Sequence, residues 1–173
     1  MTNVKLPKKL DPNKSAQLRS KYDGVYLANE MLRYSSAVAA VKAEVLVKVE
    51  FLKDAQSLTY FSGEMHSQVQ LICQRCNQVF DHSVHTEFCF TPVQGKEQTD
   101  LLPDAYEPVQ VDDQGEVDLF ELLEDELILS LPLVPLHSQQ ECSVKAESMQ
   151  FGEIEPGPMR ENPFAVLKEL KRD

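Results

Sequence analysis

The chain has 173 residues, 42% of them hydrophobic and 26% charged, which is typical of a folded domain with a hydrophobic core. The net charge of −11 argues against a general nucleic-acid-binding protein, because phosphate contacts depend on an excess of Lys and Arg. Residues 127–134, the most apolar stretch, are too few to cross a membrane, and no apolar run follows the N-terminal lysines. Four cysteines without a signal peptide then favour a reducing, cytoplasmic location.

The first third of the chain predicts two short helices followed by a strand. Asp11 is a helix-capping residue type, and Pro12 suits the first helical position, so we expect a helix that ends at Gly24. A second short helix is expected over residues 29–38. From residue 41 to residue 51 apolar and polar side chains alternate, which predicts a strand with one buried face.

Alternation continues on both sides of a Cys-Gln-Arg-Cys motif at residues 73–76. Residues 58–61 are expected to form a short strand, and residues 65–71 alternate up to the motif. Residues 84–90 alternate again after it. We therefore expect the motif to occupy the tip of a β-hairpin.

An acidic segment and a strong helix follow the hairpin. Residues 92–117 are acidic and contain three prolines, so they are expected to form an exposed loop. Asp118 is expected to cap a helix over residues 119–131, with Glu121 as its capping-box partner. The prolines that follow cannot continue that helix.

The last part of the chain is expected to be a polar tail at residues 138–161 and a docked helix that begins near Asn162. Together the elements predict one α+β domain over residues 1–173. Its antiparallel sheet would carry the Cys-x-x-Cys hairpin tip. The N-terminal helices, the central helix at 119–131 and the C-terminal helix would pack against the sheet.

Four residues form a candidate metal site. Cys73 and Cys76 supply two thiols on one turn, and His137 and Cys142 are the natural second pair. Together the four would supply the ligands of a zinc ion. Two other interpretations remain open. The paired thiols can be small buried side chains, and a redox site is less favoured because a strand rather than a helix follows the motif. Cys89 lies between two phenylalanines and is expected to be a buried apolar side chain.

Charge is distributed unevenly along the chain. Residues 97–126 contain twelve acids and no Lys or Arg, which suits contact with a basic partner. The N-terminal segment is basic and is a candidate RNA contact through its cations: Lys5, Lys8, Lys9, Lys14, Arg19 and Lys21.

One carboxylate in the central helix is unusual. Glu126 falls in the apolar arc of the helix, so it is a candidate buried carboxylate with Arg75 or His137 as partner; alternatively it reaches solvent at the helix edge. The histidines at positions 66, 82 and 85 are expected to face solvent or to be hydrogen-bonded. No Ser-His-Asp order and no phosphate-binding glycine loop is present, so we expect no enzyme and no small-molecule substrate.

Ordered short motifs carry a resemblance across nearly the whole chain. They are Lys5-Leu6-Pro7, Cys73-Gln74-Arg75-Cys76, Phe90-Thr91-Pro92-Val93, Ala105-Tyr106-Glu107-Pro108, Gly115-Glu116-Val117-Asp118-Leu119, Glu124-Asp125-Glu126-Leu127-Ile128-Leu129, Pro132-Leu133-Val134-Pro135 and Asn162-Pro163-Phe164-Ala165-Val166-Leu167. In these the chain resembles the YceD-like family, the large ribosomal RNA subunit accumulation proteins. Many members of that family carry a cysteine at the position of His137, which supports a metal-site origin for the second pair of ligands.

The resemblance implies a function in the synthesis, processing or stability of 23S ribosomal RNA, without a known catalytic activity. The partner would be a 23S rRNA precursor or a basic large-subunit ribosomal protein. From charge alone, the acidic segment favours a function as an escort that binds the basic ribosomal protein. The basic N-terminal segment instead favours an RNA-contact module that contains zinc. Both remain open at this point.

Overall fold

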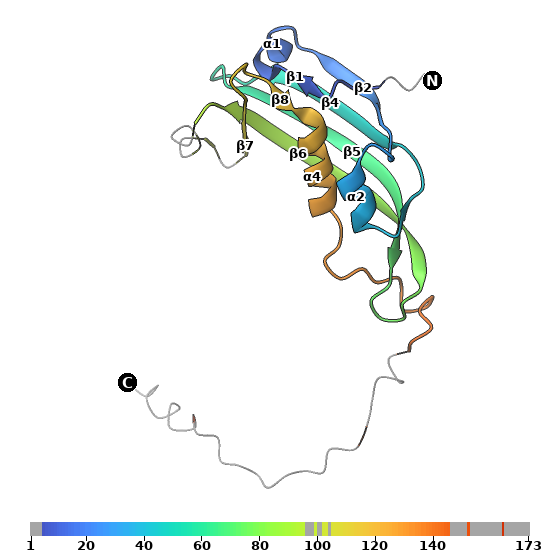
Figure 1. The fold of residues 1–173 in the computed structure, drawn as a ribbon. Coiled ribbons are helices and arrows are strands. Elements are labelled where there is room, and N and C mark those ends of the chain that lie inside the picture. The colour runs from blue at the N-terminus through green and yellow to red at the C-terminus, as the bar shows by residue number, and fades with distance from the viewer. Residues whose placement is uncertain are drawn as a thin grey trace.

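The computed structural model describes the body of the chain at residues 5–95, 99, 102–103, 105–145, 152 and 164 (Figure 1). Its strands and helices are β1 (Lys9–Leu10), α1 (Pro12–Gln17), β2 (Lys21–Tyr26), α2 (Leu32–Ala37), β3 (Ala40–Val41), β4 (Val45–Lys53), β5 (Thr59–Ile72), β6 (Val79–Val93), β7 (Glu107–Gln110), β8 (Val117–Asp118) and α4 (Leu119–Leu129). This architecture confirms the predicted α+β class.

The main sheet is built around one long hairpin. Its strands lie in the order β2-β4-β5-β6-β7, and β3 pairs with a separate part of β5. All these pairs are antiparallel except β6 with β7, which is parallel. β5 and β6 pair from Phe61 opposite Phe90 to Ile72 opposite Val79, which confirms that the Cys-Gln-Arg-Cys motif occupies the hairpin tip. β1 and β8 form a separate two-stranded ribbon.

The core lies between one face of the sheet and the helices. Alternate residues of β4, from Val45 to Phe51, are buried, as the alternation predicts. α4 adds Leu119, Leu123 and Leu127, one helical face at intervals of four residues. α2 and α4 lie side by side over this face (Figure 1). Among the described elements, no helix covers the opposite face, which we call the outer face of the sheet.

The prediction of one helix ending at Gly24 was wrong. α1 ends at Gln17, and Arg19 then adopts a left-handed backbone with φ of 49°. β2 follows and pairs with β4. The predicted cap is correct, because the Asp11 carboxylate accepts a hydrogen bond from the Lys14 backbone N–H at 3.0 Å. β2 is a strand because of its pairing with β4, a tertiary contact that outweighs the local helical pattern.

Three other boundaries need correction. The strand predicted from residue 41 begins at Val45, because Val41 belongs to β3 and pairs with β5 instead. The segment 92–117 is not all loop: it supplies the end of β6, all of β7 and the start of β8. α4 begins after its predicted cap but ends at Leu129, two residues before the predicted end, and Leu129 is 76% exposed. The predicted C-terminal helix and most of the polar tail lie outside the described residues.

Candidate metal centre

The first two thiols lie on a tight turn that we call the Cys knuckle, residues 73–76. Its geometry is fixed by backbone hydrogen bonds on both sides. The Cys73 N–H donates to the Gln78 carbonyl at 2.9 Å, and the Asn77 N–H donates to the Cys73 carbonyl at 2.8 Å. Asn77 adopts a left-handed backbone with φ of 58°, which asparagine tolerates better than most residues. The turn therefore directs both thiols to one side of the hairpin tip.

The segment after α4 brings the other two candidate ligands to this tip. Figure 1 shows it running from the end of α4 to the β5–β6 hairpin. The Gln74 N–H donates to the Pro135 carbonyl at 3.0 Å, and the rings of His137 and Phe80 meet edge to face with centroids 5.4 Å apart. A further turn, with the Cys142 N–H donating to the Ser138 carbonyl at 3.1 Å, returns the last thiol toward the knuckle.

The four side chains form a compact cluster. The ligand atoms of Cys73, Cys76, His137 and Cys142 all lie within 4.8 Å of one another, and the Cys76 Sγ lies 3.4 Å from the His137 Nε2. Cys73 and Cys142 are buried. Around zinc, with Zn–S bonds of about 2.3 Å, tetrahedral ligand atoms lie about 3.8 Å apart. A small adjustment of these separations would therefore let the three sulfurs and one nitrogen hold a metal ion.

The environment of Cys73 favours the thiolate that a metal needs. Burial by itself would raise the pKa of this thiol. Hydrogen bonds from the backbone N–H groups of His137, Arg75 and Cys76, together with the Cys76 thiol, outweigh burial and lower the pKa to about 6. Cys73 is therefore ready to bind a cation at neutral pH.

The arrangement does not match a thioredoxin-like redox site. In that site the second thiol begins a helix, whereas here the knuckle leads into β6. All four cysteines are free thiols. Cys89 lies apart from the cluster, half-buried on β6, and burial raises the pKa of its thiol. It is thus less buried than the sequence suggested.

The candidate RNA-contact cations are largely paired with acids. Lys5 and Lys8 both contact the Glu30 carboxylate. Lys9 lies 4.0 Å from Asp112, and Lys21 lies 2.7 Å from Glu50. Of the six, Lys14 and Arg19 are the two that make no ion pair to another described residue. In the folded structure the N-terminal segment therefore offers less unbalanced positive charge than its sequence suggests.

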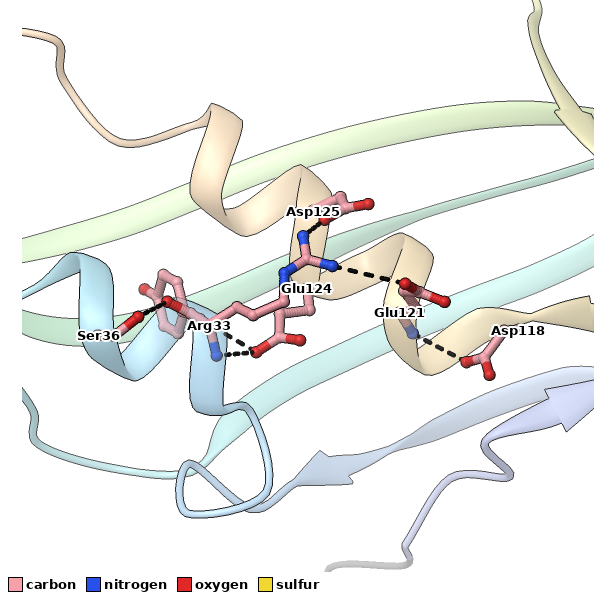
Figure 2. A network of polar contacts seen from close by, with 7 residues as sticks. Arg33, Ser36, Asp118, Glu121, Glu124 and Asp125 are labelled. Atoms are coloured by element: carbon pink, nitrogen blue, oxygen red, sulfur yellow. Dashed lines mark hydrogen bonds and ion pairs between the residues drawn. The ribbon is translucent and has the colours of Figure 1, made fainter.

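The buried carboxylate of α4 is Glu124 rather than Glu126. Glu126 is only partly buried, so it lies at the helix edge; burial first, and then the nearby Glu107 carboxylate, raise its pKa. Glu124 is 5% exposed, and one of its oxygens accepts the backbone N–H groups of Arg33 at 2.9 Å and Tyr34 at 3.0 Å (Figure 2). These groups belong to the first turn of α2.

Glu124 therefore caps a helix far away in the sequence. The residue before α2 is Met31, whose side chain makes no capping hydrogen bond. Figure 2 also shows the Arg33 side chain between Glu121 and Asp125 on α4, contacting both. Glu121 is thus paired with Arg33, while its backbone N–H is capped by Asp118 at 3.0 Å. One feature of the sequence could have indicated this contact: position 31, just before α2, has no capping side chain.

Replacing Glu124 with alanine is expected to lower the free energy of unfolding by about 2 kcal/mol, because two buried N–H groups lose their acceptor. Glu124→Gln keeps an acceptor oxygen without the charge and should lose about half as much. Urea unfolding followed by circular dichroism measures both values. Glu126→Ala is the matched control on the same helix and should change stability by less than about 0.5 kcal/mol. Equal losses at the two positions would contradict the capping role.

No helix within the described part of the chain is long and apolar enough to cross a membrane.

Comparison with known proteins places the chain in a family. Residues 61–171 match the family model described as large ribosomal RNA subunit accumulation protein YceD. A protein of that name from Haemophilus influenzae is 43% identical over 173 residues, which cover 99% of both chains. No solved structure matches the chain. The matched region contains nearly all of the β5–β6 hairpin, α4 and all four candidate metal ligands. The chain belongs to the YceD family.

Proposed function

We propose that this protein supports the accumulation of 23S ribosomal RNA during assembly of the large ribosomal subunit, and that it does so by binding rather than by catalysis. The observation that carries this proposal is the full-length similarity to a relative named for large ribosomal RNA subunit accumulation. Ribosomes are assembled in the cytoplasm, so we place the protein there. Its action would concern the synthesis, processing or stability of the RNA.

We propose a structural zinc ion in the metal centre. Three thiols and one imidazole around a closed position match the four-ligand pattern of structural zinc, which leaves no open position for a substrate. The ion would join the hairpin tip to the chain after α4, which the Gln74–Pro135 hydrogen bond and the Phe80–His137 ring contact also connect. In this proposal the metal holds a docking surface in shape and takes no part in a reaction.

A basic large-subunit ribosomal protein is the partner that the charges favour. Four of the six N-terminal cations are neutralised by acids within the chain. By contrast, Glu107 on β7 and Glu126 on α4 make no ion pair to a described Lys or Arg. Burial first, and then the nearby Glu107 carboxylate, raise the pKa of Glu126. Two neighbouring carboxylates of this kind gain most from an incoming cation. An acidic escort would shield a ribosomal protein before it meets RNA.

Direct contact with a 23S rRNA precursor is the second candidate function. It rests on Lys14 and Arg19, which lie in and just after α1 and pair with no described acid. Two cations make few phosphate contacts, so such binding would be weak and strongly weakened by salt.

Crosslinking in cells distinguishes these partners in one experiment. We expect ultraviolet and chemical crosslinking, followed by sequencing of bound RNA and identification of bound proteins, to recover a basic large-subunit protein. Glu107→Gln with Glu126→Gln should reduce that recovery, and Lys14→Glu with Arg19→Glu should leave it unchanged. The reverse pattern, with RNA lost only in the cation variant, would favour the RNA candidate. Recovery of neither partner, or normal large subunits in cells lacking the protein, would contradict the proposed function.

A further inference from the structure

Two histidines face each other on the outer face of the sheet. His66 on β5 and His85 on β6 are directly opposite in the strand register. Their rings are stacked, with centroids 4.3 Å apart and planes 24° from parallel. Each side chain is about half exposed, at 48% and 47%. Because the backbone pairing fixes both Cα positions, the two imidazoles are held together without help from a flexible loop.

Carboxylates lie beside both imidazoles on the same face. Glu64 and Glu87 are also directly opposite each other, two residues along the strands from the histidines. A Glu64 oxygen lies 3.7 Å from the His66 Nε2, and a Glu87 oxygen lies 3.7 Å from the His85 Nε2. One ligand atom each from Glu64, His66 and His85 all lie within 4.8 Å of one another.

We propose that this group is a second metal site, which holds a divalent transition-metal ion such as Zn²⁺ through the two imidazoles and the Glu64 carboxylate. Imidazole nitrogen with carboxylate oxygen is a donor set that suits zinc and its neighbours in the first row. The ion would offset the negative charge of Glu64 and Glu87. Glu87, 3.7 Å from the His85 Nε2, would add negative charge beside the ion.

This site differs from the metal centre at the hairpin tip in chemistry and in access. It has no sulfur ligand, and it lies on the exposed body of the strands rather than in a buried turn. The ion would therefore bind more weakly than at the hairpin tip and would exchange with ions in solution. Two sites on one hairpin can be told apart because thiolates and imidazoles give different spectroscopic signals on binding.

Lys48 limits the affinity of the second site. Its ammonium lies 2.9 Å from the other Glu64 oxygen, and this hydrogen bond is the main cause of the lowered pKa of Glu64. A cation on Glu64 must share that carboxylate with the lysine and is repelled by its charge. Replacing Lys48 with methionine is therefore expected to tighten metal binding roughly two- to fivefold, the factor that corresponds to an exposed ion pair.

The test is a Zn²⁺ titration of the full chain that already holds one equivalent of Zn²⁺, followed by NMR of the imidazole nitrogens and by calorimetry. We expect the ring nitrogens of His66 and His85 to shift together at micromolar Zn²⁺. His66→Gln with His85→Gln should weaken this step about tenfold or more. The matched control is His82→Gln, on the same strand but facing the other way beside Val69, and it should leave the step within about twofold.

Several outcomes would overturn the proposal. Shifts that need millimolar Zn²⁺ would identify adventitious binding. Loss of the step in His82→Gln to the same degree as in the double variant would show that the outer-face pair is not the site. Weaker rather than tighter binding in Lys48→Met would contradict the role of Glu64 as a ligand. All these side chains are at least partly exposed, so the variants are expected to fold, and circular dichroism checks that they do.

Discussion

Replacing Cys73 with serine is expected to weaken zinc binding at the hairpin tip strongly, because it removes one of the four proposed ligands. Cys73 is buried, and its sulfur accepts backbone hydrogen bonds that favour the thiolate. Loss of a residue that only hydrogen-bonds to a metal ligand typically weakens metal binding about 10- to 100-fold. Loss of a ligand itself should therefore weaken binding by about a hundredfold or more. Metal analysis of the purified protein, together with a competition titration against a chromogenic chelator, measures the change.

The same loss should follow from Cys142→Ser, because the structure places that thiol in the same cluster although it lies far away in the sequence. Cys89→Ser is the matched control. Its thiol is half-buried on β6 and lies outside the cluster, so the variant should keep one tightly bound zinc. Wild-type protein that binds no zinc under reducing conditions, or equal affinity in Cys73→Ser, would rule out the zinc centre.

Gly63→Ala is expected to destabilise the fold by about 3 kcal/mol or more. A Cβ at position 63 would lie 2.0 Å from the Lys48 backbone oxygen and 2.7 Å from the Phe88 ring. The ring could turn, but the carbonyl belongs to β4, the neighbouring strand of the sheet, and can move only with that strand. Chemical unfolding of the purified variant measures the loss.

Gly95→Ala is the control for the intrinsic effect of adding a methyl group. No atom lies within 4 Å of a Cβ at that position, so its stability should change by less than about 0.5 kcal/mol. The free face of Gly63 is instead covered by the Phe88 ring, its direct partner across the β5–β6 pair. Similar stability in both variants would mean that the close approach of the strands is not rigid.

Local patterns in the sequence were enough for much of the sheet and for two helix starts. Strict alternation identified β4 and both long strands of the hairpin, because a strand with one buried face must alternate. Asp11 and Asp118 were identified as caps because a short acidic side chain before a helix can satisfy its free N–H groups. The knuckle was likewise visible as two cysteines on one turn between strands.

Tertiary structure decided the features that depend on distant partners. β2 forms because β4 offers a free edge, and no pattern within residues 21–26 reveals that edge. Glu124 is buried because α4 packs against α2. There its carboxylate accepts N–H groups of a helix that has no capping side chain of its own. The pairing of His66 with His85 depends on strand register, because a shift of one residue would move the side chains of one strand to the opposite face. The sequence by itself determines the local preference of each segment for helix, strand or turn. Burial and strand pairing between distant segments contribute energy only once the chain is folded, so only the tertiary structure reveals them.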